Sequence, residues 1–352
     1  MRLFSKNRLA LAALFISIAA VFFNACRKDP EILPDITRED VQFYVPAGFP
    51  QPVYDFANNE VSPEGFTLGR RLFYEPRLSR DNTISCAFCH QQVSAFANTN
   101  HQFSHGIDGL FGTRNAPALF NLAWNQTFMW DGGINHIESQ PLGPVSNPVE
   151  MDESFVNIIA KLNAIPSYRS DFTAAFGDDS ITTQRICRAL AQFMGVMISA
   201  NSKYDQYQQG TASFTAEEEH GLALFRSKCV SCHTEPLFTD RSYHNNGLAV
   251  DPTINDIGRM HITNNPADSL KFKTPSLRNI TVSGPYMHDG RFSSLSQCLD
   301  HYSSGITNSP TLDPLLTGGI PLTAQEKADI IAFLATLTDN TYLSDRRFSE
   351  PH

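Results

Sequence analysis

The chain carries the pentapeptide Cys86-Ala-Phe-Cys89-His90 and, much later, the pentapeptide Cys229-Val-Ser-Cys232-His233. In such a Cys-x-x-Cys-His pattern the two thiols form thioether bonds to the vinyl groups of haem, and the adjacent imidazole reaches the iron as its proximal ligand. The pentapeptides therefore predict two covalently attached c-type haems, with His90 and His233 as the proximal ligands.

Other uses of the cysteines fit the pattern less well. A zinc site with four thiolates would not require His after both pairs, and its pairs usually lie much closer in sequence. A thioredoxin-like redox pair expects a βαβ context, which this sequence does not show. Cys187 and Cys298 lie in apolar, helix-like segments, and we interpret both as buried thiols; a disulfide between them is the alternative.

The N-terminus has the order of an export signal. Basic residues precede an apolar run over 9–23, and the small residue Ala25 then precedes Cys26. This predicts residues 1–26 as the signal and favours a lipoprotein acylated at Cys26; an ordinary cleaved signal is the alternative. We expect an exported protein, periplasmic or anchored to the outer membrane, that touches the membrane only through this lipid, because no later apolar stretch could span a bilayer.

Charge excludes one class of partner. The formal net charge of the whole chain is −9, and removal of the signal would take away further cations. An acidic chain of this kind argues against nucleic acid as a partner.

Four landmarks recur in the same order, which indicates an internal duplication. Around the first haem motif they include Gly69-x-x-Leu72-Phe73, Met129-Trp130-Asp131-Gly132 and Ser139-Gln140. Around the second they include Gly221-x-x-Leu224-Phe225, Met287-His288-Asp289-Gly290 and Ser296-Gln297. We infer two copies of one haem module.

Helix signals dominate the readable segments, whereas strand signals are weak. Helix starts are marked by capping residues, namely Thr215 with Glu218, Thr323 with Glu326, and Ser62 with Pro63. We predict a mainly α fold with two cytochrome c-like domains, each holding one covalent haem, with long ordered loops and little strand.

The expected domain organisation follows from the repeat. The predicted parts are an N-terminal linker and arm over 27–60, an N-terminal haem domain over 61–200, a linker rich in Gln, Ser and Gly over 201–213, and a C-terminal haem domain over 214–345.

Five further motifs occur in order: TRNAPALFN, MWDG, GPVSNPVEM, FKTPSLRNI and GPYMHDGRFSSL. With these motifs the sequence resembles the bacterial di-haem cytochrome c peroxidases and their relative MauG, which oxidises a tryptophan of a partner protein. The resemblance extends from about residue 65 to residue 337. It implies that the haem of His90 is peroxidatic, and that the haem of His233 receives electrons and passes them on.

The resemblance also implies catalytic residues. Glu150 matches the family's catalytic Glu, Gln140 its companion amide, and Trp130 the Trp that couples the two haems. Peroxide must lose a proton from one oxygen and gain one on the other, and a carboxylate can do both in turn. The alternatives are a surface carboxylate for Glu150 and a core residue for Trp130.

A calcium ion between the domains is a further implication. Asn115 and the backbone carbonyls of Ser283 and Pro285 match its ligands in the family. Oxygen ligands on loops suit a hard cation, although an Asn in a turn is commonly just a turn residue.

The distal ligands are less well determined. His105 matches the distal His that blocks the peroxidatic haem in many family members, with His101 as a nearby rival. At the second haem, the position where the peroxidases carry Met is Tyr302 here, which follows the MauG pattern; Met287 and His301 are the alternatives. Tyrosinate would lower the haem potential, whereas Met would raise it.

The leading prediction is a di-haem peroxidase that reduces hydrogen peroxide with electrons from an external donor protein, such as a small cytochrome c. A MauG-like oxidase of a protein or small molecule is the second hypothesis, favoured by Tyr302. A non-catalytic electron-transfer cytochrome is the third. Homodimer formation is left open.

Overall fold

The structure is a computed structural model that describes residues 36–99 and 101–351. The predicted signal and the predicted acylation site, Cys26, lie outside the described residues. The chain from Ile36 onward forms one compact unit, which is mainly helical with little strand, and this confirms the predicted fold class. In the described part of the chain, no helix is both long and apolar enough to cross a membrane.

The helices are mostly short and are joined by long ordered loops. The α-helices are α2 (Arg38–Val41), α3 (Pro63–Phe73), α4 (Cys86–Cys89), α5 (Leu142–Ser146), α6 (Phe155–Asn163), α7 (Pro166–Phe176), α8 (Thr183–Gly195), α9 (Lys203–Gln208), α10 (Ala216–Lys228), α11 (Met260–Thr263), α12 (Leu295–Asp300), α13 (Ala324–Ala335) and α14 (Asn340–Leu343). Two short strands, β1 (Tyr243–His244) and β2 (Phe272–Lys273), pair antiparallel.

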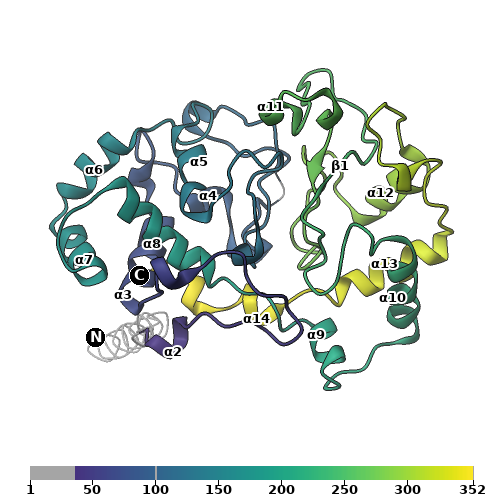
Figure 1. Cartoon of the computed structure of the whole chain (residues 1–352), viewed down its shortest axis with the longest axis horizontal. Helices are drawn as coiled ribbons and strands as arrows, with labels where there is room; N and C mark the ends of the chain where they lie inside the picture. The colour runs from purple at the N-terminus through teal and green to yellow at the C-terminus, as the bar shows by residue number, and fades with distance from the viewer. Residues whose placement is uncertain (1–35, 100, 352) are drawn as a thin grey trace, which may run out of the picture. The chain divides into compact units, whose positions relative to one another are not determined.

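The first hydrophobic core is built around α3 and α8 (Figure 1). Helix α3 begins where the sequence predicts, because Ser62 accepts a hydrogen bond from the Gly65 N–H at 3.0 Å and Pro63 occupies the first turn. A side chain at Gly69 would overlap the carbonyl oxygen of Ala189, so only glycine lets the two helices approach so closely. Large, fully buried aromatic side chains fill this core, among them Phe66, Phe73, Phe96, Trp124, Tyr168, Phe172 and Phe193.

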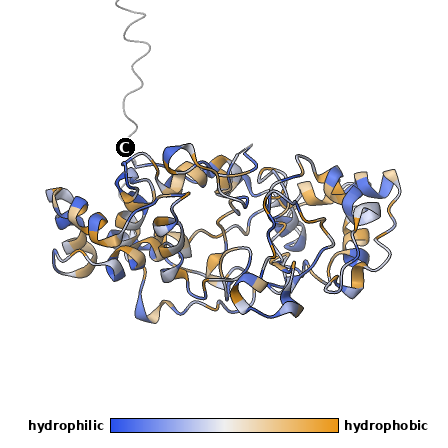
Figure 2. Cartoon of the chain, turned by 90° about the horizontal axis from the view of Figure 1, so that it is seen from above, coloured by the Kyte–Doolittle hydropathy of each residue, from blue (hydrophilic) through white to orange (hydrophobic). Residues whose placement is uncertain are grey.

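The second core repeats this arrangement with α10 and α13. Both helices begin with the predicted capping boxes, at Thr215 and at Thr323. A side chain at Gly221 would overlap the carbonyl oxygen of Asp329, just as one at Gly69 would overlap that of Ala189. The repeated Gly-x-x-Leu-Phe landmark therefore marks the same close helix crossing in each copy. Figure 2 shows apolar residues, in orange, in both halves of the unit.

Segments outside the two repeats join the cores. Helix α9 lies within 201–213, so the segment predicted as a linker is ordered, and its Tyr204 is buried in the second core. Helix α14, in yellow in Figure 1, returns to the first core, where Tyr342 is buried. The predicted domain ranges stay a prediction. Tyr204 of the predicted linker packs in the second core, and Tyr342, from the range predicted as the C-terminal haem domain, packs in the first core.

The two remaining cysteines are free thiols. Cys187 is buried and Cys298 is half-buried, and the disulfide alternative is not formed.

Candidate haem sites

The first haem motif is a short helical turn. Helix α4 spans Cys86–Cys89, and the His90 N–H donates to the Cys86 carbonyl at 3.0 Å. The Nδ1 atom of His90 lies 2.6 Å from the Phe96 carbonyl oxygen. A hydrogen bond from Nδ1 leaves Nε2 as the ring nitrogen with a free lone pair, as a metal-binding His requires. Burial lowers the pKa of His90, which favours this neutral form.

The second motif repeats the hydrogen bonds of the first, although it begins at the end of α10 and forms a turn instead of a separate helix. The His233 N–H donates to the Cys229 carbonyl at 3.0 Å, and its Nδ1 lies 3.1 Å from the Phe238 carbonyl oxygen. Burial lowers the pKa of this imidazole too. Both proximal histidines are therefore held by a carbonyl a few residues downstream, as expected for two copies of one module.

The first motif opens onto a cavity of about 460 Å³. Cys86, Cys89 and His90 all line it, and apolar side chains such as Phe73 and Leu122 form much of its wall. Two thiols and an imidazole at the edge of an apolar cavity fit a covalently attached haem. Across residues 36–99 and 101–351, no three His, Cys, Asp or Glu side chains gather as a metal-ion cluster, so the cysteine pairs do not form one zinc site.

The predicted catalytic residues meet at this cavity. Glu150 and Gln140 both line it, together with His90. Glu150 is half-buried, and this partial loss of solvent raises its pKa. Its Oε1 accepts a hydrogen bond from the Asn147 side chain at 2.8 Å, which holds the carboxylate in place. Asn147 was missed by the sequence analysis, although it lies within the GPVSNPVEM motif.

Trp130 lies where the two halves of the chain meet. It lines the same cavity, and its Nε1 donates to the Asn115 carbonyl at 2.8 Å. The Asn115 N–H in turn donates to the His288 carbonyl at 2.8 Å, so a short hydrogen-bonded path leads from Trp130 into the second half.

The structure separates the two candidates for the first distal ligand. His105 lines the cavity and packs against Phe111, with ring centroids 4.4 Å apart. His101 is exposed, and its Nδ1 lies 2.7 Å from the Thr99 carbonyl oxygen. Of the two, His105 is therefore the one placed to reach a haem in this cavity.

Asn246 connects all three distal candidates of the second haem. Its side chain donates to the Met287 sulfur at 3.4 Å and lies close enough to Tyr302 to oppose the rise of its pKa. Its carbonyl oxygen lies 3.0 Å from Nε2 of His301. This contact occupies Nε2 of His301 and leaves Tyr302 and Met287 as the freer candidates. Asn246 belongs to none of the recognised motifs, so no signal in the sequence points to it.

Tyr302 is the candidate whose surroundings point most directly to the second motif. It lies in a π-helical turn, His301–Gly305, a distortion that is frequent at functional sites. Burial raises its pKa to about 12, and the thiols of Cys298, Cys232 and Cys229 are close enough to add to this rise. The half-buried phenol thus lies near the cysteines that would carry the haem.

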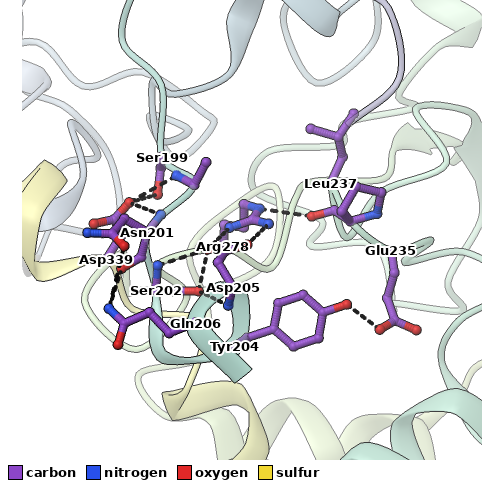
Figure 3. A network of polar contacts seen from close by, with 12 residues as sticks. Ser199, Asn201, Ser202, Tyr204, Asp205, Gln206, Glu235, Leu237, Arg278 and Asp339 are labelled. Carbon is purple, nitrogen blue, oxygen red and sulfur yellow. Dashed lines mark hydrogen bonds and ion pairs between the residues drawn. The ribbon is translucent and has the colours of Figure 1, made fainter. Parts of the chain in front are cut away.

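A buried polar network supports the loop of His233 (Figure 3). Arg278 donates two hydrogen bonds to Asp205, at 2.8 and 2.7 Å, and its Nε donates to the Pro236 carbonyl at 2.9 Å. Pro236 lies two residues before Phe238, whose carbonyl orients His233. Arg278 belongs to the FKTPSLRNI motif, but the sequence carries no signal that pairs it with Asp205.

Among the predicted calcium ligands, Asn115 uses its side-chain amide in hydrogen bonds to the protein backbone. The Asn115 side-chain amide donates to the carbonyls of His101 and Gln102, each at 3.2 Å. These contacts do not test a cation held by Asn115, Ser283 and Pro285, and that site stays a prediction.

Two haem motifs of this geometry, each beside its own helix-pair core, define a protein of the di-haem c-type cytochrome class. Residues 63–213 match the family described as di-haem cytochrome c peroxidase. The methylamine utilization protein MauG of Methylorubrum extorquens is 35% identical over 315 residues, which cover 86% of this chain and 85% of that protein. Cytochrome c551 peroxidase of Nitrosomonas europaea is 34% identical over 279 residues, which cover 77% of this chain and 79% of that protein.

A solved structure gives the same result. A MauG-like protein associated with microbial copper homeostasis superimposes with a TM-score of 0.79 and 35% identity, over 87% of this chain and 98% of that one. The chain belongs to the di-haem cytochrome c peroxidase and MauG family, as its motifs predict, and the family implies haem c as cofactor.

Proposed function

We propose that this protein reduces hydrogen peroxide to water with electrons from an external donor protein, such as a small cytochrome c. The reaction consumes one peroxide, two electrons and two protons and releases two waters. The observation that carries this proposal is that Glu150 and Gln140 line the same cavity as His90. Relatives named cytochrome c peroxidase support the same reaction.

The chain's own residues supply proton handling at this cavity. The haem iron, when bound, provides the redox chemistry. Glu150 takes a proton from one peroxide oxygen and returns it to the departing oxygen. Burial raises the pKa of Glu150 towards the working pH, which suits a group that must both accept and release a proton. Gln140 orients the peroxide, and Trp130 provides the path for electrons from the second half.

A MauG-like oxidation of a protein or small molecule is the second candidate. The placement of Tyr302 beside the second haem motif favours it, as do relatives named MauG. A non-catalytic electron-transfer cytochrome is a third candidate, and it leaves the half-buried carboxylate of Glu150 at the cavity of the first haem without a purpose.

The location of the protein, its lipid anchor and its calcium ion are proposed from the sequence pattern. The protein is exported and carries a lipid at Cys26, and it holds one calcium ion at Asn115, Ser283 and Pro285. The proposed reaction does not depend on whether the protein is a monomer or a homodimer.

One pair of measurements on the same samples separates the peroxidase from the electron-transfer cytochrome. Electron paramagnetic resonance of the oxidised and half-reduced protein reports the ligands of each iron, and steady-state assays report peroxide consumption with reduced cytochrome c. Rapid turnover with the small donor supports the peroxidase. Negligible turnover in both redox states, with both irons fully ligated, would contradict it and favour electron transfer.

A further inference from the structure

Lys273 brings a cation from the second half of the chain to the cavity of the first haem motif. It ends the short strand β2, and its backbone N–H donates to the Trp130 carbonyl at 2.7 Å. Lys273 lines the cavity that is also lined by His90 and Glu150. This backbone hydrogen bond therefore holds Lys273 next to Trp130, the residue at which the two halves of the chain meet.

Within the described residues, the Lys273 ammonium has no carboxylate partner. Arg114, the other cation of the cavity wall, is matched by Asp131 and Asp256. Glu150, the carboxylate of the wall, is held by Asn147 instead. Burial lowers the pKa of Lys273 to about 8, and no neighbouring charge opposes this fall.

Lys273 is half-buried, and an unpaired ammonium that is partly removed from water is unfavourable. Moving a charge out of water is unfavourable unless a counter-charge or hydrogen bonds compensate for it. No carboxylate of the described wall residues, Glu150 included, is within ion-pair distance of Lys273, so its counter-charge is sought in the group that fills the cavity. A haem brings two propionate carboxylates, whose oxygens accept strong charge-assisted hydrogen bonds from an ammonium.

We propose that Lys273 forms an ion pair with a propionate of the haem held by His90. The ion pair links the propionates of that haem to strand β2, which contacts Trp130. Lys273 is therefore a positioning residue between the two halves of the chain. It rests on haem binding at His90 and not on peroxide reduction, so loss of the proposed activity alone would leave it intact.

The test compares three variants of the holoenzyme. Lys273→Met keeps the length of the side chain and removes its charge, whereas Lys273→Arg keeps the charge. Lys271→Met is the matched control, because Lys271 lies two residues earlier and its ammonium lies 3.6 Å from Asp268. The readouts are the reduction potential of each haem by spectroelectrochemistry, the propionate bending bands in resonance Raman spectra, and the number of haems by mass spectrometry.

Loss of the ammonium leaves the propionate charge uncompensated, which disfavours an added electron on the nearby iron. We expect Lys273→Met to lower the reduction equilibrium constant of the first haem about tenfold, equivalent to about 59 mV for one electron. The propionate bands shift as well, while the second haem changes much less. Lys273→Arg retains the parental values, and Lys271→Met changes neither haem.

Unchanged propionate bands and an unchanged first potential in Lys273→Met would overturn the proposal. Equal shifts at both haems would also overturn it, because they would indicate a general effect of charge. If Lys273→Met loses a haem, Lys273→Arg decides: two haems with parental bands support the pair, and the same loss contradicts it.

Discussion

Arg278 and Asp205 form a buried ion pair through two parallel hydrogen bonds of 2.8 and 2.7 Å, with the Arg278 side chain wholly removed from solvent (Figure 3). Asp205 belongs to α9, the helix between the two modules, and Arg278 supports the loop that orients His233. Burial opposes ionisation of Asp205, but the hydrogen bonds and charge of Arg278 outweigh it, and the pKa of Asp205 is lowered. The pair therefore joins the inter-module segment to the second haem site.

Removal of one partner of this pair should destabilise the protein strongly. We expect Asp205→Ala to lower the free energy of unfolding by about 3–5 kcal/mol, because it leaves a buried guanidinium uncompensated. Denaturant unfolding measures the change. The exposed pair Arg38–Glu60 is the control, and Arg38→Ala should cost at most about 1 kcal/mol.

The same pair predicts a pH dependence of stability. A carboxyl group whose pKa is lowered in the folded state contributes stability above its unfolded pKa, and that contribution is lost as the pH falls through the folded value. The stability difference between the parent and Asp205→Asn should thus shrink on acidification. A difference that grows towards low pH would contradict the assignment.

Glu150 should control proton transfer. We expect Glu150→Gln to retain both haems and to lose a factor of about 10²–10⁴ in peroxide turnover. In the parent, turnover should fall as the pH drops through a pKa above the ordinary 4.5, because only the carboxylate can accept a proton, and the variant should lack this acidic limb. Asp152→Asn is the control, since Asp152 lies in the same loop but pairs with Arg80. A variant within about twofold of the parent would remove Glu150 from the mechanism.

His105 should act as a switch at the first haem. If it binds the iron in the fully oxidised protein, that haem is low-spin and slow with peroxide until the other haem is reduced. His105→Ala should make the oxidised enzyme reactive without this step, as followed by absorption spectra after rapid mixing with peroxide. His101→Ala should behave like the parent, because His101 is exposed and is not among the residues that line the cavity. A parent that is already high-spin and fully active when oxidised would refute the switch.

Tyr302 should be the distal ligand of the second haem. We expect Tyr302→Phe to change the absorption spectrum of that haem and to raise its potential, because a phenolate stabilises the ferric state. Met287→Leu should leave both nearly unchanged. The reverse result, with a response only to Met287→Leu, would assign Met as the ligand and remove the main support for a MauG-like reaction.

Covalent haem attachment should depend on each pentapeptide separately. Mass spectrometry of protein matured in an exporting host should show two haem additions in the parent. Replacement of both cysteines of one motif, Cys86 and Cys89 or Cys229 and Cys232, should remove one addition each. A parent with fewer than two would contradict the assignment of both sites.

Some features of the molecule could be predicted from the sequence because they depend on near neighbours. The geometry of each haem motif is a property of one pentapeptide, and both copies indeed show the same hydrogen bond from His to the first Cys. The starts of α3, α10 and α13 follow from capping residues within one turn. The repeated glycines were visible as a pattern, but only the structure shows that each lies against a helix backbone.

Other features depend on contacts between distant parts of the chain, which no local pattern encodes. By itself the sequence determined two haem sites, a duplicated module and a mainly helical fold, since covalent chemistry and short-range backbone preferences are written in consecutive residues. Only the tertiary structure decided that His90, Gln140 and Glu150 share one cavity, and that Lys273 enters it from the other half of the chain. Those residues meet because the packing of two cores brings their loops together. Loss of solvent then raises the pKa of Glu150 and lowers the pKa of Lys273.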